Sequence, residues 1–346
     1  MFENQLTMNK ISRKEFFRIG GSIVGGGAIA GVSGKLLWDM FKQPEKVFHI
    51  DDDATDAPDE APSPYRKLAS ARVEAEVEAF DLLGDRMVVA GGNLVTLYTP
   101  EGEVESRFGA GPDIRDLVVA GDEIYLLYPA HIDVFSLEGK LLRGWEACSD
   151  ESDYCSMTVT PKSVFVTDAA AKNLCQYRPD GTHVRFIDSP AGFVVPSYSF
   201  GIAHRDGIVY VSNPGRHRVE KYDEDGQFLG AFGQAGTDPG SFSGCCNPVH
   251  LSVSPSGEII TSEKGLPRVS CYSPEGEFRS VVLNGRTLGG GHDAYEARIG
   301  ADGRVFVAGK HSLAVYKYDS ALADGSNAAC SICGIQDCPI RRGVNV

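Results

Sequence analysis

The amino-acid sequence predicts an all-β fold, a six-bladed β-propeller of four-stranded antiparallel blades, because one short pattern recurs at blade length. An aromatic residue recurs six times at spacings of 37 to 50 residues, and each of the first five is followed four positions later by a glycine. These aromatic residues are Tyr98, Phe135, Tyr177, Tyr222, Tyr272 and Tyr318. Repeats of this length that consist of short strands are typical of propeller blades. The 40 glycines and 13 tyrosines supply the tight turns and large core side chains that such a meander of strands needs.

The fourth repeat shows the expected strands of one blade most clearly. Short apolar or alternating runs occupy residues 202–207, 209–213, 218–223 and 226–233, and Asp-Gly or Asn-Pro-Gly residues separate them. Four antiparallel strands follow from this alternation and these turns. The fifth repeat has the same order, and Arg268 follows Arg218 at the 50-residue spacing that also separates Tyr272 from Tyr222.

These two repeats resemble the NHL repeat, a blade family in which an Asp-Gly turn, a short apolar strand, an Arg-apolar pair and an aromatic-Asp-x-x-Gly turn follow one another. Repeats one and two lack the arginine, and repeat three has Leu174-Cys175 in its place. The resemblance implies the propeller fold but assigns no function. NHL propellers include binders of protein or RNA, extracellular ligand-binding modules and a few lyases that use a metal and histidines.

The sixth repeat is incomplete. It keeps Asp302-Gly303 and Tyr318-Asp319 but ends before a fourth strand. A closed ring needs the edge of its last sheet to be paired. We therefore expect a segment ahead of the first repeat, either Lys46 to Ile50 or Ala71 to Val77, to complete the last blade.

The first 40 residues predict an export signal that precedes the folded body. Residues 12–18, Ser-Arg-Lys-Glu-Phe-Phe-Arg, lead into a weakly apolar, glycine-rich run from Ile19 to Gly34 with a small-residue cleavage site at Ala28-Ile29-Ala30. The segment resembles a twin-arginine translocation signal in which Lys14 replaces the second arginine. This resemblance implies passage through the twin-arginine translocase to the periplasm or cell envelope. The alternative is a membrane anchor, which remains as a tether if the signal is not cleaved.

The rest of the chain divides into three parts by composition. Residues 41–69 form an acidic linker that contains the run DDDATDAPDEAPSP from Asp51 to Pro64. Residues 70–320 form the six-bladed NHL-like propeller, and residues 321–346 form a cysteine-containing C-terminal tail. The formal net charge of −14 argues against nucleic acid as a partner, because phosphate binding requires a concentrated Lys/Arg surface.

The nine cysteines point to a metal site or to disulfides. Cys330, Cys333 and Cys338 have a spacing at which three thiolates can converge on one zinc or copper ion or an iron–sulfur cluster, with a fourth ligand from elsewhere. Two further groups, Cys148 with Cys155 and Cys245 with Cys246, follow the fourth strands of repeats two and four. Their loops should emerge on one face of the propeller, around the mouth of the central channel. The metal-ligand candidates are Cys245, Cys246, His292, Cys330, Cys333 and Cys338.

Two alternatives to this metal site stay open. Disulfides would join Cys148 to Cys155, two of the tail cysteines to each other, and Cys245 to Cys246 or to the tail. The thiols can also be inert. Cys175 and Cys271 lie inside strand patterns and are expected to be small buried core residues.

Catalytic candidates come from aligning the repeats by their turn glycines. This alignment places His292 and Asp293 of the sixth repeat at the positions of Cys246 and Asn247, while His250 follows Cys246 by four residues. His250, His292 and Asp293 are therefore expected at the channel mouth. The carboxylates of Glu263, Asp293 and Glu296 can serve there as acids or bases, but their spacing singles out no pair.

Taken together, these patterns favour an exported NHL-type propeller that serves as a binding or assembly module at the cell envelope. Its expected partner is a protein or a small ligand at the propeller face, with a metal or iron–sulfur centre or a docked redox partner. One alternative is a metal-dependent periplasmic enzyme, a lyase or hydrolase, with its site at the channel mouth. Another is a structural interaction domain that disulfides stabilise.

Overall fold

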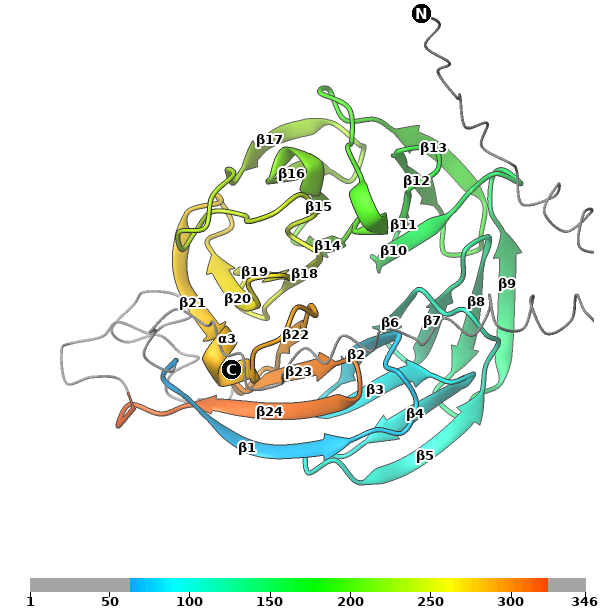
Figure 1. Cartoon of the computed structure of the whole chain (residues 1–346). Helices are drawn as coiled ribbons and strands as arrows, with labels where there is room; N and C mark the ends of the chain where they lie inside the picture. Colours follow the sequence, from blue (N-terminus) through cyan, green and yellow to red (C-terminus); the bar gives the residue numbers. More distant parts are fainter. Residues whose placement is uncertain (1–62, 323–346) are drawn as a thin grey trace, which may run out of the picture. The chain divides into compact units, whose positions relative to one another are not determined.

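The computed structural model describes residues 63–322, which form six sheets of four antiparallel strands each (Figure 1). Blade 1 contains β2 (Ala79–Leu83), β3 (Arg86–Gly91), β4 (Leu94–Tyr98) and β5 (Val104–Gly109). Blade 2 contains β6 (Asp116–Ala120), β7 (Glu123–Leu127), β8 (His131–Ser136) and β9 (Leu141–Glu146). Blade 3 contains β10 (Tyr154–Val159), β11 (Val164–Asp168), β12 (Asn173–Tyr177) and β13 (His183–Ile187).

The second half of the ring continues the same pattern. Blade 4 contains β14 (Ile202–Arg205), β15 (Ile208–Asn213), β16 (Arg218–Asp223) and β17 (Phe228–Phe232). Blade 5 contains β18 (His250–Val253), β19 (Ile259–Glu263), β20 (Arg268–Tyr272) and β21 (Phe278–Asn284). Blade 6 contains β22 (Glu296–Ile299), β23 (Val305–Gly309), β24 (Ser312–Tyr318) and β1 (Tyr65–Arg72). The predicted six-bladed, four-stranded propeller is thus confirmed.

Helices contribute little to the described residues. The 3-10 helices η1 (Pro196–Tyr198) and η2 (Pro214–Arg216) and the short helix α3 (Gly285–Leu288) lie in connections before or between strands. Within residues 63–322, no helix is long and apolar enough to cross a membrane.

The strand order places one strand of each blade at the centre of the ring. Blades 1 to 5 run from their innermost to their outermost strand along the chain, and β22 is innermost in blade 6. The innermost strands β2, β6, β10, β14, β18 and β22 are neighbours around the centre (Figure 1). Each connection from an outermost strand to the next innermost one therefore arrives at the same face of the ring.

The ring closes through β1, the first strand of the described chain. β1 pairs antiparallel with β24, with Tyr65 opposite Tyr318 and Arg72 opposite Ser312 (Figure 1). A strand from ahead of the first repeat does complete the last blade, as expected. However, the closing strand is 65–72 rather than Ala71 to Val77, and Lys46 to Ile50 lies outside the described residues. The sheet also begins at Tyr65, within the stretch that the sequence assigned to the linker.

The core lies between adjacent blades, and the repeated glycines allow the blades to approach. Gly139 and Gly276 both have positive φ, at 81° and 102°, as their turns require. A Cβ atom added at Gly139 would lie 2.3 Å from the Phe108 ring of blade 1, and one at Gly276 would lie 2.4 Å from the Phe232 ring of blade 4. The aromatic–x3–Gly pattern therefore marks the places where one blade's turn meets the outer strand of the blade before it.

Arg268, the repeat arginine of blade 5, anchors the connection that leads into its own blade. Its guanidinium is buried and pairs with the buried carboxylate of Glu263. It also donates to the backbone carbonyls of Thr237, at 2.8 Å, and Ser241. Because a buried charge needs partners, this arginine fixes the loop between β17 and β18.

Candidate functional site

The innermost strands bring their first residues together around the channel mouth. β6, β18 and β22 begin at Asp116, His250 and Glu296, and Glu78 directly precedes β2. These residues are 38 to 218 positions apart in the sequence. Because all six innermost strands start at the same face, four titratable side chains from four blades meet at one mouth.

Arg298 pairs with two carboxylates on the blade 6 side of the channel. Its guanidinium pairs with the Glu296 carboxylate at 2.7 Å and with the Asp81 carboxylate of blade 1 at 3.2 Å. It also lies over the ring of Phe80, 5.2 Å from the centroid. Glu296 and Arg298 are two residues apart on β22 and so point to the same side of the strand. The ion pair therefore joins the innermost strands of the first and last blades.

Asp116 faces the channel from blade 2 and holds blade 3 against it. Its carboxylate accepts hydrogen bonds from the Ser156 hydroxyl at 2.6 Å and from the backbone N–H groups of Met157 at 2.7 Å and Leu117 at 2.8 Å. The side chain is buried. This carboxylate has a clear structural role between β6 and β10.

Burial and repulsion between carboxylates shift the pKa values of the acids at the mouth upward. The pKa of Asp116 is raised to about 6, mainly by burial and next by the charge of Glu296. Burial also raises the pKa of Glu296, against the opposing effect of Arg298. The pKa of Glu78 is raised by burial and by Asp113. In each case burial is the largest cause, because it disfavours the charged form of the carboxyl group.

His250 shows the opposite shift. Burial lowers its pKa to about 4, and the positive charge of Arg298 contributes in the same direction. The imidazole is therefore neutral at pH 7, with a free nitrogen lone pair. Its lone pair can therefore accept a hydrogen bond or a proton from a ligand bound at the mouth.

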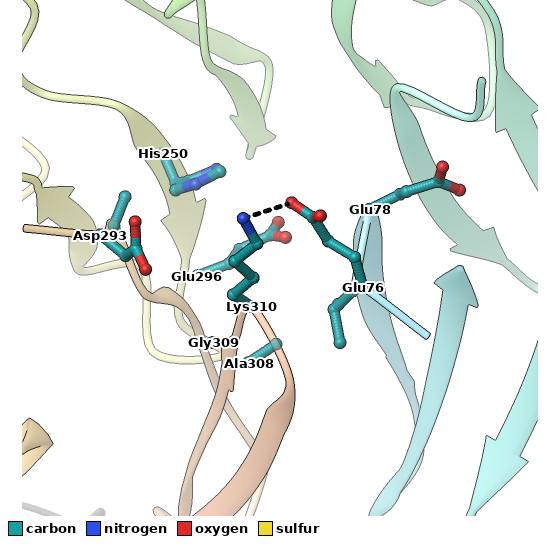
Figure 2. Close-up of a pocket in the computed structure, with 10 residues that line it drawn as sticks. Glu76, Glu78, His250, Asp293, Glu296, Ala308, Gly309 and Lys310 are labelled. Atoms are coloured by element: carbon teal, nitrogen blue, oxygen red, sulfur yellow. Dashed lines mark ion pairs between the residues drawn. The ribbon is translucent and has the colours of Figure 1, made fainter. Parts of the chain in front are cut away.

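A cavity of about 190 Å³ opens beside these residues (Figure 2). The carboxylates of Glu76, Glu78, Asp293 and Glu296 line it together with His250 and Lys310. Lys310, in the turn between β23 and β24, pairs with Glu76 at 3.5 Å, and this is the ion pair drawn in Figure 2. The lining thus contains four carboxylates against one ammonium group and a neutral imidazole.

The structure brings together only some of the residues that the sequence singled out. His250 and Asp293 line the same cavity, with Glu296 beside them. His292 is exposed, and its side chain does not line the cavity. Its backbone carbonyl accepts from the Gly265 N–H at 3.1 Å. Glu263 is buried at the end of β19, where it pairs with Arg268, and it does not line the cavity.

The cysteines at the mouth do not form a ligand group with these residues. Cys245 is exposed and Cys246 is buried in a loop that Asn247 holds, through bonds from its amide to the carbonyls of Ser243 at 2.7 Å and Lys264 at 2.9 Å. Among residues 63–322, no three His, Cys, Asp or Glu side chains are grouped so that they could hold a metal ion. Cys330, Cys333 and Cys338 lie outside the described residues, so the metal site stays a prediction.

The expected disulfides within the propeller are not formed in the structure. Cys148, Cys155, Cys245 and Cys246 are all free thiols. Cys155 donates to the Asp153 carbonyl, with 3.7 Å between the sulfur and the oxygen, and Cys148 contacts the Tyr177 hydroxyl at 3.0 Å. Cys175 is buried in the core, as expected.

Sequence reasoning missed Asp116, Arg298, Glu78 and Lys310. No short motif contains them, because each comes from a different blade or turn. A usable signal does exist: the residue at or just before the start of each first strand faces the mouth. Alignment of the repeats on that position, instead of on their turn glycines, would have found Glu78 and Asp116 beside His250 and Glu296.

Comparison with known proteins supports the fold and leaves the activity open. No protein-family model matches the chain, and no curated protein matches it. Among solved structures, a virginiamycin B lyase from Staphylococcus aureus is 11% identical, with a TM-score of 0.52 over 73% of this chain and 99% of that one. A streptogramin B lyase is 13% identical, with a TM-score of 0.50 over 74% and 97% of the two chains. A luciferin-regenerating enzyme is 11% identical, with a TM-score of 0.50 over 72% and 94%.

These similarities define the class of protein to which the chain belongs. It is a six-bladed β-propeller of four-stranded blades with a charged mouth at one end of its channel. At such low identity the comparisons establish the fold alone, because one fold hosts many unrelated functions.

Proposed function

We propose that this protein is an exported propeller that binds a small, positively charged ligand at the mouth of its channel. The observation that carries the proposal is the cavity where Glu76, Glu78, Asp293 and Glu296 meet. Lys310 pairs with Glu76 and Arg298 pairs with Glu296, so the charges of Glu78 and Asp293 are the ones left to attract a cation. A cation in this cavity would stabilise the ionised carboxylates of Glu78 and Glu296, whose pKa values are raised mainly by burial and further by neighbouring carboxylates.

The proposal also gives the propeller a place in the cell. The segment around Arg13 resembles a twin-arginine signal, so we expect the folded body to work at the cell envelope, alone or docked to a partner protein. A change of Arg13 and Lys14 to glutamine should abolish recovery of the protein in the periplasmic fraction. Unchanged export of that variant would refute the twin-arginine route.

Binding can be tested with simple organic cations as probes. We expect spermidine or a quaternary ammonium compound to raise the melting temperature of the protein at low salt, and the effect should weaken at higher ionic strength. Glu78→Gln should reduce the shift, since it removes one of the four carboxylates that line the cavity. Glu101→Gln, in an exposed turn of blade 1, is the matched control and should leave the shift unchanged. Equal shifts in both variants would rule out this site.

A second candidate function, an enzyme, rests on His250. A neutral imidazole in the cavity can accept a proton from a bound substrate, as lyase chemistry requires. Two structural neighbours are named lyases, and a catalytically inactive variant of one was solved with quinupristin. Quinupristin is therefore the first substrate to assay, by chromatography of the products. Turnover that persists in His250→Gln would exclude His250 as the base, and turnover that is absent in the unchanged protein would exclude this substrate.

A further inference from the structure

The loop between β9 and β10 carries Cys148 over the interface between blades 2 and 3. Backbone hydrogen bonds fix both ends of this loop to the turn after β7. The Ala147 N–H donates to the Ala130 carbonyl at 2.8 Å, and the Tyr154 N–H donates to the Pro129 carbonyl at 2.9 Å. The position of Cys148 is therefore set by backbone contacts on either side of it.

Two tyrosines and a second cysteine lie below Cys148. Its thiol is 3.0 Å from the Tyr177 hydroxyl, and its backbone N–H donates to the Tyr154 hydroxyl at 3.3 Å. The two tyrosine hydroxyls are hydrogen-bonded to each other. The Cys175 thiol interacts with the Tyr154 hydroxyl and with the Cys148 thiol, and it packs in the same core cluster as Tyr154 and Tyr177. Two thiols from different parts of the chain thus meet in one small polar cluster.

Strand alternation explains why Cys148 meets Cys175 and not Cys155. Successive residues of a strand point to opposite faces of its sheet. Tyr154, Cys175 and Tyr177 lie on the face of blade 3 that packs against blade 2. Cys155 follows Tyr154 on β10 and packs on the other face, against the cluster formed with blade 4. Cys155 is therefore nearer to Cys148 in the sequence than Cys175 is, but it lies on the opposite face of the sheet.

We propose that Cys148 and Cys175 are a redox-active thiol pair that forms a disulfide in an oxidising compartment. The oxidant belongs to the class of disulfides, such as oxidised glutathione or the disulfide of a thiol oxidoreductase. The Cys148 thiolate attacks one sulfur of the oxidant, and the first thiol leaves with a proton from solvent. Cys175 then loses its proton and attacks the Cys148 sulfur, which releases the second thiol. Two protein thiols are oxidised and one disulfide is reduced to two thiols.

The surroundings of the two thiols set this order of events. Cys148 is an exposed residue of the loop, whereas Cys175 is fully buried. Burial raises the pKa of the Cys175 thiol to about 12, so it is the resolving partner. The product would fasten the loop to β12 and close a covalent ring from residue 148 to residue 175. Such a link stabilises the folded state by restricting the unfolded chain.

Peptide mapping of the full chain tests the pair directly. The protein is incubated with oxidised glutathione, alkylated, unfolded and digested with chymotrypsin, which can cleave after Tyr154 and so separates Cys148 from Cys155. We expect a linked peptide pair that contains Cys148 and Cys175, with Cys155 recovered as a thiol. A Cys148–Cys155 link, or recovery of both Cys148 and Cys175 as thiols or as glutathione adducts, would overturn the proposal.

Two variants and a control keep the test independent of folding defects. Cys148→Ser changes an exposed loop residue and should leave Cys175 as a thiol after oxidation. Cys175→Ala should retain glutathione on Cys148 as a stable mixed disulfide. Cys245→Ser removes another exposed cysteine and should leave the yield of the linked peptide unchanged. Oxidation should raise the urea midpoint of the unchanged protein but not that of Cys148→Ser, and an equal rise in both would contradict the link.

Discussion

At the scale of single residues, the channel mouth holds two groups whose pKa values move in opposite directions. The pKa of Asp116 rises from an ordinary 3.8 to about 6, while that of His250 falls from 6.5 to about 4. The folded state therefore binds a proton at Asp116 more tightly than the unfolded chain does, and a proton at His250 less tightly. As pH falls from 6.5 to 4, Asp116 adds stability and His250 removes it.

His250→Gln should separate the two effects. Without the histidine, the loss of stability between pH 6.5 and pH 4 disappears, while the gain from Asp116 remains. The free energy of unfolding of the variant, minus that of the unchanged protein, should be about 2 kcal/mol larger at pH 4.5 than at pH 7. Urea unfolding at the two pH values measures this difference. His311→Gln, at an exposed position, is the control, and an equal pH effect in both variants would contradict the assignment to His250.

At the scale of one element, the turn after the third strand of blades 1 to 5 places two requirements on one glycine. It takes a positive φ, and it leaves room for a side chain from the preceding blade. Gly207, in the turn between β14 and β15, meets only the first requirement. Its φ is 80°, but nothing lies within 4 Å of a Cβ atom added there. Gly276 has a similar φ of 102°, but the Phe232 ring lies 2.4 Å from the added Cβ atom.

Gly207→Ala and Gly276→Ala should therefore differ in stability. The change at Gly207 should cost about 1 kcal/mol, from backbone strain alone. The change at Gly276 should cost about 2 kcal/mol more, because Phe232 must move in a packed interface between blades. Denaturant unfolding of the two variants gives the comparison. Equal losses would show that the repeat glycine serves only its turn.

At the scale of the whole molecule, the ring depends on a strand that comes from the start of the described chain. β1 supplies the outermost strand of blade 6 and pairs with β24 along its length. Without β1, the backbone groups of β24 would form an open sheet edge, which is a template for association with another chain. Ring closure and solubility are therefore coupled through residues 65–72.

Truncation tests this coupling. A protein that starts at Ser63 keeps β1 and should remain a folded species with an unfolding midpoint like that of the full chain. A protein that starts at Val73 lacks β1 and should unfold at lower urea concentration and associate at micromolar concentration. Light scattering and urea unfolding measure both properties. A stable, unassociated protein without β1 would show that the last blade tolerates three strands.

The sequence by itself determined the number of blades, their four-stranded form and most strand positions, since periodicity and turn residues report local geometry. The strands of blade 4 show this: β16 has the expected bounds, 218–223, and β14 begins at the expected Ile202. Only the tertiary structure decided which segment closes the ring, because β1 pairs with a strand more than 200 residues away and its own pattern is short.

The tertiary structure also decided which side chains meet. Asp293 and His250 were expected at the mouth and line its cavity, but Arg298 and Glu78 carry no motif that marks them. Cys148 lies with Cys175 instead of its nearer neighbour Cys155, since β10 turns adjacent residues to opposite faces. The sequence repeat determines the strands and turns within each blade. The residues that face one another across blades depend on how the strands are placed around the ring, and no local pattern encodes that.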